Sequence, residues 1–99
     1  MARVIVTGPA KRDIRHILSD LAARAGHRIA ERYGADFKAT YHRLSSFPES
    51  GSPRPTLGAN IRIALVLPYI VIYENTNDGS VAVLRVLHGK RDITRDLIR

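Results

Sequence analysis

The stretch from Val81 to Asp92, VAVLRVLHGKRD, decides the fold of this chain. Apolar and β-branched residues continue almost without a break from Val81 to Leu87, which predicts a strand that is covered on both faces. Arg85 interrupts this run, and a basic pair, Lys90 and Arg91, follows where the strand ends. The stretch therefore combines a buried strand with a positively charged segment directly after it, which we call the exit of the strand.

Two more strands are predicted directly upstream. Apolar residues alternate over 61–67, and YIVIYE, from Tyr69 to Glu74, has the aromatic and β-branched composition of a strand. Pro68 predicts a tight turn between them, and Asn75 to Gly79 predicts a hairpin turn because its Asp-Gly pair tolerates positive φ. Tight turns between consecutive strands predict an antiparallel meander.

The first half of the chain predicts one short strand and two helices. The strand runs from Arg3 to Thr7, and Thr7 or Gly8 can cap a helix that has Pro9 in its first turn. Apolar residues at helical spacing continue to Gly26, which suits a helix end. A second helix is expected from His27 or Arg28 to the break at Ser46-Phe47-Pro48.

The order of these elements predicts an α+β fold of the type βααβββ. We expect a twisted antiparallel sheet packed against the N-terminal helical hairpin, with the Pro-rich segment from Pro48 to Gly58 as a loop. A short C-terminal helix is expected after Asp92, its N-cap, with Ile93, Leu97 and Ile98 as its apolar residues. The length of 99 residues predicts one domain over 1–99.

The composition is that of a globular protein, with 44% hydrophobic and 25% charged residues. The absence of cysteine excludes disulfides and thiolate metal sites. The sequence has neither an apolar run that could span a bilayer nor the hydrophobic region of a signal peptide. We therefore expect a cytoplasmic protein that does not act at a membrane.

The net charge of +7 predicts attraction to a polyanion or to an acidic protein. A basic surface without a dedicated partner is the alternative. Nothing in the sequence predicts a cofactor or a metal, because the spacings of the histidines match no standard metal site; these are His16, His27, His42 and His88. Asp13 and Asp20 are expected on a solvated helix face, and the carboxylates suggest no acid–base pair.

The cationic residues of the later strands are the best candidates for a binding site. They are Arg62, Arg85, His88, Lys90 and Arg91. If the strands over 61–67 and 81–87 lie near each other, these side chains form a positive concavity that can hold phosphate. Two alternatives stay open for Arg85, since its charge must reach either a groove or an internal carboxylate.

Three segments of the chain resemble the RelE/ParE superfamily of toxins from type II toxin-antitoxin systems. They are the loop FPESGSPRPTLGANIR from Phe47 to Arg62, the strand YIVIYE, and the run VLRVLHGKRDI that closes the sheet. The three segments have the order and spacing of that superfamily, and the resemblance covers nearly the whole chain. The resemblance implies the fold of that superfamily and the function of a growth inhibitor that an antitoxin neutralises.

The superfamily has two branches, which act by different means. RelE-like members are ribosome-dependent endonucleases that cleave mRNA with basic residues, whereas ParE-like members inhibit DNA gyrase. The positions of the nuclease pattern are apolar here, namely Ile61, Ile63, Ile70 and a position near Leu97; Arg91 is retained. Apolar side chains cannot stabilise phosphoryl-transfer charge or move a proton. The resemblance thus favours inhibition of gyrase by binding.

The alternative function is that of a RelE-type mRNA endonuclease, with Arg62, Arg85, His88 and Arg91 as its catalytic residues. An inactive or purely structural partner is a third possibility. The resemblance also implies a small acidic antitoxin with a ribbon-helix-helix or similar DNA-binding half. Its other half would wrap over the toxin, and the complex would bind operator DNA through the antitoxin.

Overall fold

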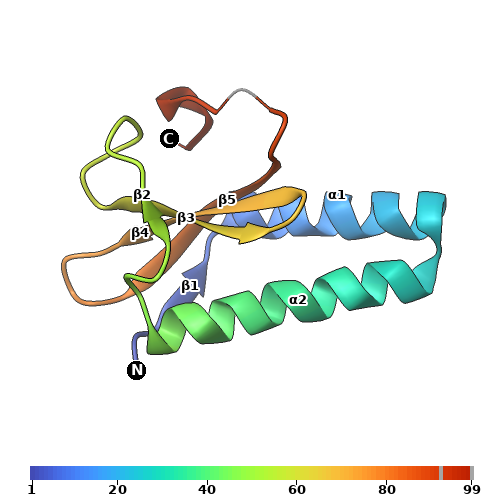
Figure 1. Cartoon of the computed structure of the whole chain (residues 1–99), viewed down its shortest axis with the longest axis horizontal. Helices are drawn as coiled ribbons and strands as arrows, with labels where there is room; N and C mark the ends of the chain where they lie inside the picture. Colours follow the sequence, from blue (N-terminus) through green and yellow to red (C-terminus); the bar gives the residue numbers. More distant parts are fainter. Residues whose placement is uncertain (92, 99) are drawn as a thin grey trace.

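The computed structural model describes residues 1–91 and 93–98 of the chain. The elements in chain order are β1 (Val4–Val6), α1 (Gly8–Ala25), α2 (His27–Ser46), β2 (Ser52–Pro53), β3 (Ile61–Val66), β4 (Tyr69–Asn75), β5 (Val81–His88) and the 3-10 helix η1 (Arg95–Ile98). The hairpin of α1 and α2 lies on one side of the sheet, and the C-terminal segment lies on the other (Figure 1). The predicted α+β fold is confirmed.

The sheet has the strand order β1-β5-β4-β3-β2. The strands β3, β4 and β5 form the predicted antiparallel meander. The sheet is nevertheless mixed, because β1 runs parallel to β5, with Val4 opposite Val81 and Val6 opposite Val83. Parallel neighbours need a connection much longer than a turn, and here it contains α1, α2 and the strands β2 to β4.

The Pro-rich loop contains a short strand that the sequence did not predict. Ser52 pairs with Ile63, and Pro53 pairs with Arg62, at the edge of the sheet beside β3. Proline is tolerated at an edge because the missing N–H leaves no ladder bond unmade. Two residues are too few to give an alternating pattern, so this pairing depends on the neighbouring strand.

The helix boundaries agree with the sequence prediction, and Thr7 is the N-cap of α1. Its Oγ1 accepts a hydrogen bond from the Ala10 amide at 3.4 Å and donates to the Val83 carbonyl at 2.8 Å. The same side chain thus caps α1 and ties it to β5. Gly26, with φ of 96°, lies between the two helices in a conformation that favours glycine.

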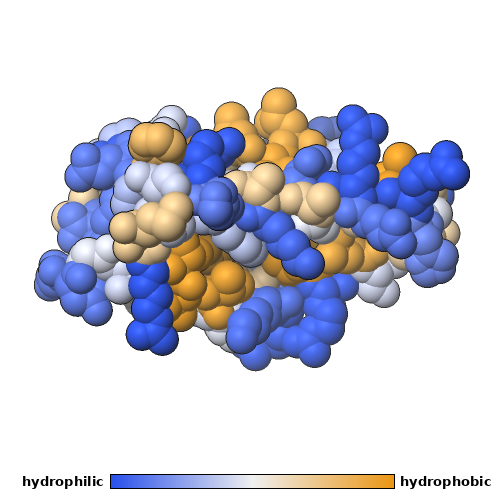
Figure 2. Space-filling model, turned by 90° about the horizontal axis from the view of Figure 1, so that it is seen from below, coloured by the Kyte–Doolittle hydropathy of each residue, from blue (hydrophilic) through white to orange (hydrophobic). Residues whose placement is uncertain are grey.

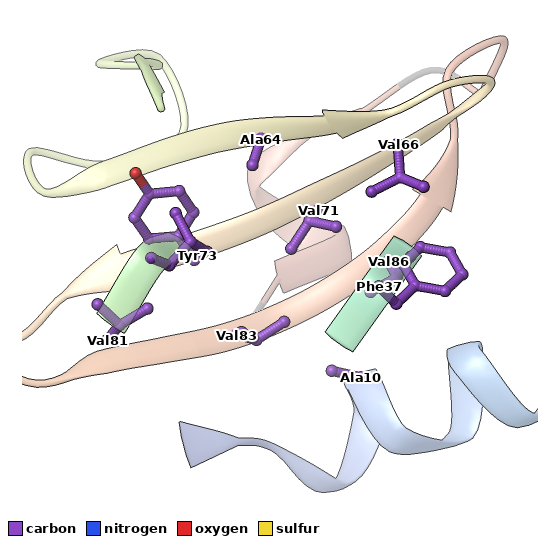
Figure 3. Packing of buried hydrophobic residues seen from close by; sticks show 10 residues of the cluster. Ala10, Phe37, Ala64, Val66, Val71, Tyr73, Val81, Val83 and Val86 are labelled. Atoms are coloured by element: carbon purple, nitrogen blue, oxygen red, sulfur yellow. The ribbon is translucent and has the colours of Figure 1, made fainter. Parts of the chain in front are cut away.

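The core lies between the helices and the sheet (Figure 3). Its buried residues are Ala10, Phe37, Leu44, Ala64, Val66, Val71, Tyr73, Val81, Val83 and Val86. Burial of each large apolar side chain stabilises the fold by roughly 1.5–3 kcal/mol. On the outer side of α2, the surface is mostly hydrophilic with apolar patches between the polar side chains (Figure 2). An apolar side that faces the core and a mostly hydrophilic outer side are what the amphipathic pattern of the helices predicts.

The opposite face of the sheet carries a second apolar cluster. Its buried members are Ile61, Ile63, Ile72 and Leu87, and Leu57, Ile70, Leu84, Ile93, Leu97 and Ile98 pack against them. The prediction that the strand over 81–87 is covered on both faces is therefore confirmed. The C-terminal segment contains a 3-10 helix over Arg95–Ile98, shorter than the helix expected there, and its predicted N-cap, Asp92, lies outside the described residues.

Candidate target-binding site

Arg85 is bonded within the chain to a carboxylate, and it also lines a hollow beside helix α1. Its Nε donates to Oδ2 of Asp13 at 2.6 Å, and its Nη2 donates to Oδ1 of the same carboxylate at 2.9 Å. Its Nη1 donates to the Leu97 carbonyl at 2.8 Å. These contacts hold the pKa of Arg85 above its usual value, chiefly through the hydrogen bonds to Asp13, although burial acts in the opposite direction. Of the two alternatives for Arg85, the internal carboxylate is correct.

The expectation that Asp13 lies on a solvated helix face was wrong. Its carboxylate also accepts a hydrogen bond from the backbone amide of Val86 at 3.0 Å. Asp13 thus satisfies a donor of β5 and neutralises Arg85 at the same time. Arg85 lies opposite Ile72, and the register of the pairing shifts directly after this pair, between Ile72 and Tyr73 of β4. Sequence spacing could not reveal this pair, because 72 residues separate its members.

Arg62 supports the Pro-rich loop and lies apart from the other predicted site residues. Its Nη1 donates to the Glu49 carbonyl at 2.9 Å and to the Gly51 carbonyl at 2.7 Å. The buried Tyr73 hydroxyl donates to the Pro48 carbonyl at 2.8 Å and accepts from the Gly51 amide at 2.9 Å. Since β4 lies between β3 and β5, the predicted concavity does not include Arg62.

His88 and Arg91 line a hollow between the end of β5 and helix α1. The α1 residues on its wall include His16 and Asp20, and Tyr69 of β4 also lines it. The rings of His88 and Tyr69 meet edge to face with their centroids 5.7 Å apart. Burial is the main cause that raises the pKa of Tyr69, with Tyr33 and Asp20 adding to the effect. Lys90 is exposed beside this hollow and its amide donates to Nδ1 of His88 at 3.1 Å.

Two side chains at this end of the molecule were not among the residues predicted for the binding site. Arg12 and His16 are exposed on α1, and both line hollows that Arg91 also lines. Their spacing of one helical turn places them on one face of α1. That signal was present in the sequence, but polar residues on an amphipathic helix are usually only solvated, so their position beside β5 could not be foreseen.

The positions of the nuclease pattern lie together in the second apolar cluster. Ile61 and Ile63 are buried in it, and Ile70 and Leu97 pack against them. No group of three or more His, Cys, Asp or Glu in the described ranges could hold a metal ion. Within the same ranges, no helix combines the length and the apolar character that crossing a membrane requires.

The family described as the ParE toxin of the type II toxin-antitoxin system parDE matches residues 4–93. The chain belongs to this family. Toxin ParE3 of Caulobacter vibrioides is 32% identical over 97 residues, which are 98% of this chain and 96% of that protein. The assignment makes the chain a ParE-family toxin of type II toxin-antitoxin systems, as its three sequence segments predicted.

Solved structures agree with the ParE-family assignment. The chromosomal ParDE toxin-antitoxin system from P. aeruginosa contains a chain that matches with a TM-score of 0.73 and 18% identity, covering 89% of this chain and 96% of that one. The toxin-antitoxin complex RelBE2 from Mycobacterium tuberculosis contains a match with a TM-score of 0.62 and 25% identity, covering 88% and 96%. The ParE-family chain therefore has the fold of the wider RelE/ParE superfamily.

Proposed function

We propose that this ParE-family toxin arrests growth by binding DNA gyrase and that it does so without cutting RNA. The observation that carries the proposal is the second apolar cluster, in which Ile61, Ile63 and Ile70 stand at positions of the nuclease pattern. A cluster of buried aliphatic side chains can neither transfer a proton nor stabilise a developing charge. A mechanism by binding does not need either ability.

Among the residues first considered for target binding, His88, Lys90 and Arg91 are the ones that we retain. All three are exposed at the exit of β5. Arg85 is already bonded to Asp13, and Arg62 is bonded to two loop carbonyls. The RelE-type alternative needs Arg62 and Arg85 in catalysis, so their internal contacts weaken it.

A cognate antitoxin is the second part of the proposal. The solved relatives named above are described as toxin-antitoxin assemblies. The net charge of +7 suits a small acidic partner whose disordered segment folds as it binds. We place the toxin in the cytoplasm, acting as one domain over 1–99, and expect the antitoxin to carry a ribbon-helix-helix or similar half that brings the complex to operator DNA.

The test is a supercoiling and cleavage assay with purified toxin, gyrase, plasmid and ATP. We expect lost supercoiling or linear DNA, reversed when the antitoxin is added. The variant with Lys90→Gln and Arg91→Gln should inhibit less than the variant with Arg28→Gln and Arg32→Gln, which removes the same charge from exposed positions of α2. No inhibition at high toxin excess would refute gyrase as the target.

The same samples test the alternative function. Toxin incubated with ribosomes and mRNA should leave the mRNA intact if the mechanism is binding. Codon-dependent cleavage that is lost in His88→Ala and Arg91→Gln would instead establish the RelE-type endonuclease. Growth of cells that express the toxin without its antitoxin would support the third possibility, an inactive partner.

A further inference from the structure

A groove runs along α1 beside the exit of β5. One hollow lies between Asp13, His16 and Asp20 of α1 and Tyr69, His88 and Arg91. A second hollow, lined by Arg12, Arg85 and Leu97 among others, shares Asp13, His16 and Arg91 with the first. Because the two hollows have these three residues in common, they adjoin each other, and together we call them the α1 groove.

Two carboxylates of the α1 groove, Asp13 and Asp20, are paired with arginines, whereas Arg12 and Arg91 form no ion pair within residues 1–91 and 93–98. Asp13 is neutralised by Arg85, and Asp20 forms an ion pair with Arg24 at 3.0 Å. Asp96, which also lines the groove, is engaged in an interaction as well. Within residues 1–91 and 93–98, no ion pair involves Arg12 or Arg91. The groove therefore presents positive charge that the described part of the chain does not satisfy.

His88 contributes a hydrogen-bond donor to the same surface. Its Nδ1 accepts a hydrogen bond from the Lys90 amide, so the proton of the neutral imidazole is on Nε2. The ring lies edge to face against Tyr69, which in turn contacts Tyr33 with ring centroids 5.6 Å apart. These contacts orient the imidazole with Nε2–H as its remaining donor.

We infer that the α1 groove binds the phosphodiester backbone of a nucleic-acid strand. Arginine guanidinium groups donate paired hydrogen bonds to phosphate oxygens, and the groove carries one such group from α1 and another from the segment after β5. Cations spread along a groove suit a linear polyanion better than a single small anion. The net charge of +7 adds attraction at longer range.

This contact goes beyond the proposed function, because it needs no gyrase and no cleavage. Arg91 and Leu97 of the nuclease pattern line the groove, while Ile61, Ile63 and Ile70 of the same pattern lie in the second apolar cluster and outside the groove. A strand held in the groove would meet donors that bind phosphate, but the apolar positions supply no charge or proton for its hydrolysis. Binding and gyrase inhibition can therefore be measured, and can fail, separately.

The test is fluorescence anisotropy of the full chain with labelled single-stranded and duplex DNA and with RNA of the same sequence, over a range of salt. The groove variant carries Arg12→Gln and Arg91→Gln. We expect it to bind about tenfold more weakly at low salt and to lower the slope of log affinity against log salt by about 2. The charge-matched control, Arg28→Gln with Arg32→Gln on α2, should keep nearly all of the affinity.

Several results would overturn the inference. If the groove variant and the control variant lost the same amount of nucleic-acid affinity, binding would depend on the overall surface charge and not on the groove. Absence of binding to DNA and RNA at low salt would exclude the contact. Competition by inorganic phosphate as effective as that by an oligonucleotide of equal phosphate content would indicate a site for a single anion. A preference for DNA or for RNA supports the inference and identifies the strand. Circular dichroism should show that all variants are folded.

Discussion

An arginine lies in the middle of β5 and another lies at its exit; the first is mostly buried and paired, whereas the second is exposed. The side chain of Arg85 is 20% exposed and is bonded to Asp13 and to the Leu97 carbonyl. Arg91 follows a few residues later and is exposed, without an ion pair to any residue in 1–91 or 93–98. The difference shows that a cation inside this strand holds distant parts of the chain together, whereas a cation after it is available to a partner.

The largest expected effect comes from Arg85→Ala. It leaves the carboxylate of Asp13 partly buried without its counter-charge, which should lower the free energy of unfolding by about 3–5 kcal/mol. Denaturant unfolding measures the loss. In the paired variant Arg85→Met with Asp13→Asn, no charge stays uncompensated and the amide of Val86 keeps an acceptor, so at least half of the loss should be recovered. If Arg85→Ala left the free energy of unfolding unchanged, Arg85 would not stabilise the fold, and the proposed difference between Arg85 and Arg91 would be refuted.

A smaller effect is expected at Arg62, the arginine that supports the loop. Arg62→Ala removes the donor to the carbonyls of Glu49 and Gly51 and should cost about 1–2 kcal/mol. Limited proteolysis should then cut the segment 48–58 faster. The control is Arg54→Ala, whose side chain bonds only to the neighbouring Pro53 carbonyl among the hydrogen bonds of the described residues. Faster cutting in both variants would argue against a specific role of Arg62.

Tyr41 extends the comparison to an uncharged polar group. Its hydroxyl is buried without a hydrogen-bond partner among the described residues, and burial raises its pKa from 10.0 to about 12. Between these pH values the unfolded state loses this proton while the folded state keeps it, so stability should fall as the pH rises. In Tyr41→Phe the fall should be shallower, whereas stability at pH 7 should change by less than about 1 kcal/mol. Parallel curves for both proteins above pH 10 would contradict this.

The smallest effect on stability is expected at the exit of β5. Arg91→Gln should change the free energy of unfolding by less than about 0.5 kcal/mol, because the side chain is exposed. If Arg91→Gln keeps its stability but binds nucleic acid more weakly, then Arg91 contributes to binding and not to folding. A destabilisation as large as that of Arg85→Ala would show that the exit is structural too. Calorimetry of both single variants under one condition gives the comparison directly.

Local signals explain why most of the fold could be predicted. Thr7 and Pro9 mark the start of α1, Gly26 marks its end, and the alternating apolar residues of 61–67 mark a strand. Each of these depends on a few neighbouring residues. The parallel pairing of β1 and the short β2 could not be predicted, because both depend on strands far along the chain.

The candidate site was predicted less completely than the fold. His88 and Arg91 lie at one hollow as their positions suggested, but Arg62 lies across the sheet and Arg85 is bonded internally. Arg12 was not considered and His16 was weighed only as a metal ligand, since their helix spacing indicates a solvated face equally well. A sequence shows which residues carry charge, while the fold decides which of these charges compensate one another.

The sequence by itself determined the helices, the meander and membership of the ParE family, because capping, periodicity and motif order are local properties. Only the tertiary structure decided that Asp13 is the partner of Arg85 and that α1 forms a wall beside the exit of β5. The interaction energy of two charges depends on their distance in space and not on their separation in the sequence. Which arginine stabilises the fold and which one is available for binding therefore depends on how α1 packs against the last strand.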